Sequence, residues 1–235
     1  MRSTFRKLII GAPRKDVRPP QNTLRGRWAN VVAIWENTYE EDAGLEKLVR
    51  LVLALSQFLF PGAYIKHAFW RKGVLVQDFV MEVYVLVKTF LPLAVLALHK
   101  EDDPLLFWAV VWLMAETILY IPTLIFASDA LPSPRSYRRS KLLIFLNYLE
   151  VVFSFALVHM AGQYMNQPFV NWTDAVYVSF VITSTIGFGE FVPVTGVGKL
   201  VVALQSLFYL SYIALFISFF NLGGNKGYFE DLGRR

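Results

Sequence analysis

The chain has 235 residues, of which 55% are hydrophobic, and its mean hydropathy of +0.44 is too high for an ordinary soluble domain. It contains no cysteine, which excludes disulfides, thiol catalysis and cysteine-ligated metal sites. The net charge of +5 would suit a nucleic-acid partner, but the basic residues gather beside long apolar segments, so we expect a membrane protein that binds no nucleic acid.

A basic cytoplasmic arm is predicted at residues 1–44. Its first 30 residues carry eight lysines and arginines and a single acid, Asp16. Such a segment is attracted to the anionic lipids of the inner leaflet, so we expect a solvated arm that meets the membrane. A cleaved organelle-targeting peptide is the alternative interpretation.

An amphipathic helix is predicted at residues 45–62, with Pro61-Gly62 at its end. Its apolar residues recur at helical spacing, and its charged residues fall on the other side. We expect this helix to lie on the inner membrane surface. The alternative is a fifth membrane span, which would place the basic N-terminus outside. The apolar residues are Leu45, Leu48, Val49, Val52, Leu55 and Leu59.

Four segments are long and apolar enough to cross a membrane, because a spanning helix needs about 20 mostly apolar residues. The sequence therefore predicts an all-α integral membrane protein. The first two spans form a peripheral hairpin at residues 74–130. The predicted spans are residues 74–98, 105–127, 142–164 and 200–220.

The orientation follows from the connectors between the spans. Residues 101–103 are acidic, whereas residues 135–141 are basic, and lysines and arginines stay on the cytoplasmic side. Both termini are then cytoplasmic, including a short tail at residues 222–235. We expect a multi-pass protein of a plasma membrane or a bacterial inner membrane.

Ionisable residues inside the spans are expensive to bury and are functional candidates. Lys88 and Glu116 lie near the middles of the first two spans, so we predict that they form a structural ion pair. Glu150 of the third span is interpreted as protonated, paired or close to a pore. His159 of the same span is interpreted as a packed residue.

The segment between the last two spans, residues 171–199, is too long for a tight turn and too apolar for an exposed loop. Asn171 or Thr173 is predicted to cap a short helix, and Asp174 suits the positive N-terminus of that helix. The following TSTIGFGE run would then dip into the membrane. Non-helical backbone at that depth must be buried in protein or line a watery cavity.

This run resembles the selectivity filter of potassium channels, for which the TVGYG loop is a familiar example. The surrounding residues extend the resemblance over residues 141–221. Asp174, Ala175 and Ser179 match the family's pore helix, and the FVPVT run at residues 191–195 matches the approach to its inner helix. The resemblance implies a re-entrant pore helix and a homotetramer, because one filter per chain cannot surround an ion.

The resemblance also implies site residues and a bound ion. Ser184 and Asp174 would support the filter, Gly189 would complete the outer mouth, and Glu190 would lie behind or beside it. Potassium ions would be the only cofactor. The backbone carbonyls that bind potassium would come from Thr185, Ile186, Gly187 and Phe188.

Three departures from the family pattern bear on selectivity. Phe188 replaces the commoner tyrosine and lacks its hydroxyl. Glu190 replaces the commoner aspartate, and the pore helix has Val178 and Val181 where many relatives have an aromatic or acidic residue.

The gate is a separate question, because the last span has neither glycine nor proline from residue 200 to 222. The sequence favours gating at the filter. The alternative is an apolar constriction formed by Phe208, Phe216 and Phe219, although each of these also suits packing against the outer helix.

The sequence thus predicts a potassium-selective channel and no enzyme. A weakly selective cation channel is one alternative. A non-conducting membrane scaffold or auxiliary subunit is another.

Overall fold

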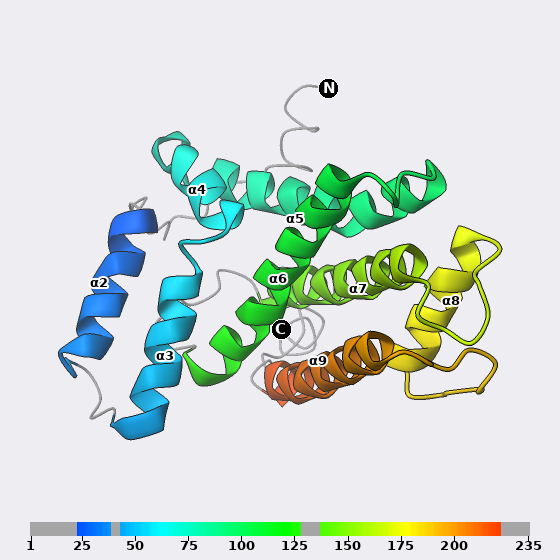
Figure 1. Cartoon of the computed structure of the whole chain (residues 1–235). Coiled ribbons are helices and arrows are strands. Elements are labelled where there is room, and N and C mark those ends of the chain that lie inside the picture. Colours follow the sequence, from blue (N-terminus) through cyan, green and yellow to red (C-terminus); the bar gives the residue numbers. More distant parts are fainter. Residues whose placement is uncertain (1–22, 39–42, 128–136, 222–235) are drawn as a thin grey trace, which may run out of the picture.

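The computed structural model describes residues 23–38, 43–127 and 137–221, together with the side chains of all of these except 137, 138 and 218–221. Every regular element in these ranges is helical (Figure 1). The elements are α2 (Thr23–Trp35), α3 (Gly44–Ser56), α4 (Pro61–Ala68), η1 (Trp70–Lys72), α5 (Val74–Ala97), α6 (Pro104–Phe126), α7 (Tyr137–Gly162), α8 (Trp172–Thr183) and α9 (Gly196–Asn221).

The four predicted spans are confirmed as helices long and apolar enough to cross a membrane. They are Val74–Ala97, Pro104–Phe126, Arg139–Gly162 and Gly196–Ile217. α7 begins earlier than the predicted span, because the basic residues before position 142 form its first turn. α9 likewise begins at Gly196, where the Thr195 hydroxyl accepts a 3.0 Å hydrogen bond from the Gly198 N–H.

The turn between α5 and α6 is set by local chemistry in the acidic connector. His99 has a φ of 50°, which reverses the chain after α5. Asp103 then caps α6, where its carboxylate accepts from the N–H groups of Leu105 at 2.9 Å and Leu106 at 3.3 Å. Pro104 occupies the first helical position, where its missing N–H is harmless.

α7 is the central helix of the bundle and packs against α5, α6, α8 and α9. α7 and α9 lie side by side, and α8 sits at the end where α7 ends and α9 begins (Figure 1). α7 is the most deeply buried of the candidate spans, with 61% of its most apolar 18-residue stretch inside the protein. α7 and α9 therefore flank the start of the loop that follows α8.

α2 was not expected, because the arm's sequence lacks a clear helical pattern. Val31 and Ile34 of α2 bury against Ala54 of α3, so tertiary packing supplies what local propensity does not. Lys47 closes the contact by donating to the Trp35 carbonyl at 2.8 Å, near the C-terminus of α2. The described part of the arm is therefore not wholly a solvated chain.

α3 buries Arg50, Leu53, Ala54 and Ser56 and leaves several of its apolar residues exposed. Arg50 is buried, whereas Leu45 is 76% exposed and Leu48 is 59% exposed. α2 and α3 run across the direction of α7 and α9, at the end of the bundle opposite α8 (Figure 1). An outward apolar face in that position suits the headgroup boundary of a membrane. α3 and α4 meet at a 57° bend and would also qualify together as a fifth span by length and composition.

The surface position of α3 is tested by two single-cysteine variants, since the chain has no other cysteine. Glu36→Cys lies between α2 and α3, and Asp102→Cys lies in the acidic connector. We expect an impermeant maleimide added to intact cells to label Asp102→Cys but not Glu36→Cys, because the charge pattern predicts that only the connector is external. External labelling of Glu36→Cys that matches Asp102→Cys would mean that the α3–α4 pair crosses the membrane.

Candidate functional site

Asn171, one of the two predicted candidates, is the N-cap residue of α8, whereas Thr173 lies inside the helix; Asp174 at the third helical position completes a capping box. The Asp174 carboxylate accepts from the N–H groups of Val170 at 3.2 Å and Asn171 at 3.0 Å. A carboxylate here also complements the positive end of the helix. Asp174 therefore holds the start of the helix rather than contacting an ion.

The C-terminus of α8 leads directly into the TSTIGFGE run. The Ile186 N–H donates to the Val181 carbonyl at 3.2 Å, and the Thr185 N–H donates to the Ile182 carbonyl at 3.1 Å. This pair of bonds is a Schellman motif, in which the residue after the cap is left-handed and usually glycine. Here that residue is Thr185, with a φ of 59°. A β-branched residue in this region is strained, and such strain is characteristic of functional sites.

Left-handed backbone recurs at every second residue of the run. Thr185, Gly187 and Gly189 have φ values of 59°, 57° and 82°, whereas the residues between them are not left-handed. Such alternation of the two backbone hands allows successive carbonyls to point toward one side of the chain. The glycines make this possible at little cost, and only Thr185 is strained by it. Backbone carbonyls are neutral, hard oxygen ligands, and a row of them can replace an ion's hydration shell.

The side chains of the run are exposed in the single chain. Ile186 is 59% exposed and Phe188 is 64% exposed, although both are apolar. The space beside the glycines is also open, since a Cβ placed on Gly187 or Gly189 would meet nothing within 4 Å. The TSTIGFGE run is therefore supported from one side and open on the other.

The outer end of the run is held by a tyrosine that the sequence analysis did not single out. The rings of Tyr177 and Phe188 stack at a 5° interplanar angle, with centroids 6.4 Å apart. The Tyr177 hydroxyl donates to the Glu190 carboxylate at 3.4 Å. The hydroxyl that Phe188 lacks is therefore supplied by Tyr177 of the pore helix, which donates it to a residue at the end of the filter. A tyrosine one turn after Asp174 is the signal that could have found it.

The chain leaving the run is clamped by the loop between α7 and α8. The Asn166 N–H donates to the Val192 carbonyl at 2.9 Å, and its side chain accepts from the Val192 N–H at 3.0 Å. The side chains of Asn166 and Gln167 both donate to the Glu190 carbonyl, at 3.2 and 3.3 Å. Phe169 and Phe191 stack with centroids 5.1 Å apart. Two loops far apart in sequence therefore fix the outer mouth together.

Comparison with known proteins agrees with this geometry. The family described as "Ion channel" matches residues 142–222. Potassium voltage-gated channel subfamily KQT member 1 of Xenopus laevis is 31% identical over 80 residues. Member 4 of that subfamily in Homo sapiens is 30% identical over 82 residues.

Residues 142–222 thus match an ion-channel family, and the chain is similar over about 80 residues to potassium channels. We call residues 142–222 the pore module, with α7 as outer helix, α8 as pore helix and α9 as inner helix. The matches cover 31% and 34% of this chain and 12% of each relative, so they concern the pore module alone. No solved structure matches the chain.

A buried polar cluster behind the filter was also missed by sequence reasoning. The Gln205 side chain on the inner helix contacts Ser179 and Thr183 of the pore helix and His159 of the outer helix. All four side chains are at most 1% exposed. His159 is thus a packed residue, as the sequence indicated, but it packs through a hydrogen bond. An amide in an apolar inner helix is the signal that could have shown the cluster.

The structure does not support Phe208 as a gate residue. Phe208 is buried at 5% exposure and packs with Tyr212 against residues of α6 and α7, away from the exposed side of α9. Phe216 is partly buried against the same cluster, and the side chain of Phe219 lies outside the described residues. The packing alternative therefore holds for Phe208. The exposed apolar residues of the inner helix include Leu200, Leu204, Leu207, Leu210 and Ile217.

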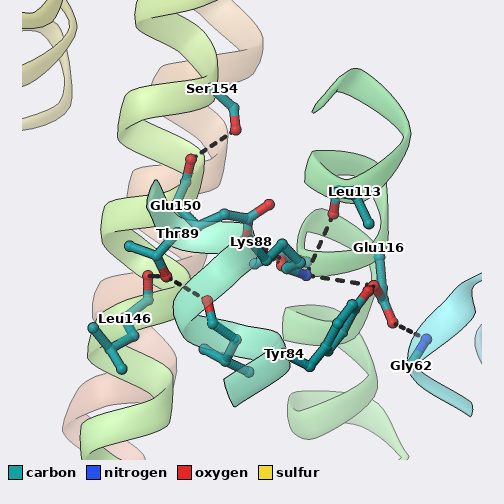
Figure 2. Close-up of polar contacts among 11 residues, drawn as sticks. Gly62, Tyr84, Lys88, Thr89, Leu113, Glu116, Leu146, Glu150 and Ser154 are labelled. Carbon is teal, nitrogen blue, oxygen red and sulfur yellow. Dashed lines mark hydrogen bonds and ion pairs between the residues drawn. The ribbon is translucent and has the colours of Figure 1, made fainter. Parts of the chain in front are cut away.

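The predicted Lys88–Glu116 pair is brought together by the structure and joined by a third charge (Figure 2). The Lys88 ammonium lies 3.5 Å from the Glu116 carboxylate and 3.6 Å from the Glu150 carboxylate. The Thr117 hydroxyl accepts from Lys88 at 2.5 Å and donates to Glu150 at 2.6 Å. One cation thus lies between two acids that come from α6 and α7.

Further contacts of Glu116 extend this charge cluster to α4. The Tyr84 hydroxyl donates to Glu116 at 2.5 Å, and the Gly62 N–H donates to it at 3.2 Å. A side chain at position 62 would collide with Glu116, because a Cβ there would lie 2.4 Å from its carboxylate oxygen. The cluster consequently ties α4, α5 and α6 to the outer helix of the pore module. Glu82, a further intramembrane acid, pairs instead with Arg139 at 2.5 Å.

Removal of the shared cation should destabilise the protein more than removal of one acid. Lys88→Met leaves two buried carboxylates without a counter-ion, and such a loss costs about 3–5 kcal/mol. Glu116→Gln leaves the Lys88–Glu150 pair, so we expect a smaller loss. The double variant should lose less free energy of unfolding than the sum of the losses in Lys88→Met and Glu116→Gln. The measurement is unfolding by a denaturing detergent in a double-mutant cycle.

The matched control is Glu82→Gln on the same helix. Glu82 is 37% exposed, so loss of its ion pair should change stability by at most about 1 kcal/mol. Strictly additive effects of Lys88→Met and Glu116→Gln would contradict the cluster.

Proposed function

We propose that the chain is one subunit of a homotetrameric, potassium-selective ion channel. The observation that carries the proposal is the left-handed backbone at Thr185, Gly187 and Gly189, because it aligns a row of carbonyls without any reactive side chain. The carbonyls of residues 185–188 would bind potassium, and Gly189 would complete the outer mouth. The match of the pore module to an ion-channel family and the similarity of the chain to potassium channels support the same function.

The tetramer is proposed because the filter and the inner helix are exposed in the single chain. One carbonyl row cannot surround an ion, whereas four rows around an axis can. Ile186, Phe188 and the exposed leucines of α9 would then face neighbouring subunits or the pore. Apolar surface on a membrane-spanning helix can face lipid or pack against another subunit, and copies of the chain arranged around the filter would supply the second.

The inner surface of the membrane is the proposed environment of the arm, α2 and α3. Aromatic and basic residues also meet at η1, where the guanidinium of Arg71 lies 5.4 Å from the Trp70 ring centroid. Such pairs are typical of membrane interfaces, and basic residues there attract anionic lipid. We propose both termini to be cytoplasmic on this basis.

Weak selectivity is the second candidate, and one observation favours it. The outer end of the filter is held by a 3.4 Å hydrogen bond from Tyr177, at an exposed position, rather than by a buried hydroxyl. A loosely held carbonyl row would discriminate less between potassium and sodium.

The function is tested by planar-bilayer recording of the purified protein in asymmetric potassium and sodium chloride. We expect a reversal potential close to that of potassium. Gly187→Ala should abolish this preference, because alanine at a φ of 57° costs about 1–2 kcal/mol and would displace the carbonyls. The space beside Gly187 is open, so the variant should still insert into the membrane.

The outcomes of the recording separate the candidates. A reversal potential near zero would indicate a weakly selective channel. No current from folded protein would indicate a scaffold or auxiliary subunit. Normal selectivity in Gly187→Ala would contradict the filter assignment.

The oligomeric state is tested by native mass measurement in detergent. We expect four copies of the 26.9 kDa chain, because one filter strip comes from each subunit. A dimer or a pentamer of the unmodified chain would exclude a four-fold filter.

A further inference from the structure

The strained backbone at Thr185 needs support from its surroundings. A threonine with a φ of 59° costs about 1–3 kcal/mol and persists only where neighbouring structure fixes it. The outer end of the filter has Tyr177 and the loop clamp, but these lie beyond Phe188. The inner end must be held by whatever contacts the last turn of the pore helix, which ends at Thr183.

Gln205 is the residue that makes this contact. Its amide nitrogen lies 2.7 Å from the Thr183 hydroxyl, 2.9 Å from the Ser179 hydroxyl and 3.0 Å from the Ser179 carbonyl. Thr183 is two residues from the strained Thr185. A side chain of the inner helix is thus hydrogen-bonded to the end of the pore helix from which the filter starts.

The amide orientation follows from the partners. The Ser179 carbonyl can only accept, so the Gln205 NH₂ group must face the pore helix and its oxygen must face His159. His159 Nε2 lies 2.9 Å from that oxygen and therefore carries the proton that it donates. The Ser179 hydroxyl donates to the Val152 carbonyl of the outer helix at 2.6 Å. Three helices consequently meet in one directional network.

We propose that Gln205 is a positioning residue for selective conduction, which holds the pore-helix end against α9 and α7 and so keeps the strained entry of the filter in place. The inference rests on the proposed potassium-channel function and adds a residue to it. It also implies that a displacement of the inner helix at Gln205 reaches the filter through Thr183.

The test compares potassium over sodium permeability ratios of three variants in the full-length tetramer. Gln205→Met keeps the side-chain length and removes the hydrogen bonds. Thr183→Val breaks the same contact from the pore helix and leaves the bond between Gln205 and His159. The matched control is Ser206→Ala on the same helical turn, because among the described residues the Ser206 hydroxyl bonds only the Val202 carbonyl of its own helix, at 2.9 Å.

We expect Gln205→Met and Thr183→Val each to lower the permeability ratio by about tenfold, equivalent to about 1.4 kcal/mol of discrimination. Ser206→Ala should leave the ratio within about twofold of the unmodified channel, as expected for a substitution that breaks only a bond within its own helix. A purely structural role for Gln205 would lower the amount of channel without changing this ratio.

Each outcome decides the question. Unchanged permeability ratios in both Gln205→Met and Thr183→Val, or an equal change in Ser206→Ala, would overturn the inference while leaving the channel function intact. If only Gln205→Met fails to assemble, Thr183→Val decides. Failure of both to assemble would make the contact a folding requirement and also overturn the inference. If the unmodified protein carries no selective current, the proposed function itself fails.

Discussion

The constraint on which the pore module depends is the need to keep non-helical backbone ordered at membrane depth. Each unpaired N–H or carbonyl in hydrocarbon costs several kcal/mol, so such a segment must be buried in protein or line water. The run at residues 185–189 alternates left-handed residues with others, and in the proposed filter this would place its carbonyls on one side. The opposite side must then be held by protein, and the surrounding elements are arranged to do this.

Support comes at three levels along the filter. Gln205 holds the last turn of the pore helix, Tyr177 contacts Phe188 and Glu190 at the outer end, and the Asn166 loop clamps the chain that leaves. The inner support is buried and the outer support is exposed. The filter is consequently anchored more firmly at its entry from the pore helix than at its mouth.

The charge cluster performs a different task, which is to attach the peripheral helices to the pore module. One lysine lies between two carboxylates, and the second Glu150 oxygen, Oε1, has no hydrogen-bond partner among the described residues. Buried charges of this kind rarely add stability compared with apolar packing, but breaking them is costly. Together with Gly62, the cluster fixes one packing arrangement of α4, α5 and α6 on α7. Movement of the peripheral helices would therefore act on the outer helix.

The sequence by itself determined the four spans and the candidate filter. Hydropathy over about 20 residues is a local property, and glycine spacing indicates backbone conformation directly. The spans and the candidate filter can therefore be predicted without knowledge of the tertiary structure. The sequence also suggested the Lys88–Glu116 pair, because the depth of a residue in a span follows from its position along the helix. It left open whether Phe208 lines a constriction or packs, since the rotation of a nearly uniform apolar helix is set by packing and not by composition.

Only the tertiary structure decided which side chains meet behind the filter and between the helices. Gln205 and Thr183 are 22 residues apart and Lys88 and Glu150 are further apart still, and no periodicity connects them. α2 likewise forms because Val31 and Ile34 find Ala54 on α3, although its own sequence is a weak helix former. Long-range contacts of this kind depend on helix rotation and crossing, which residue patterns along one helix do not specify.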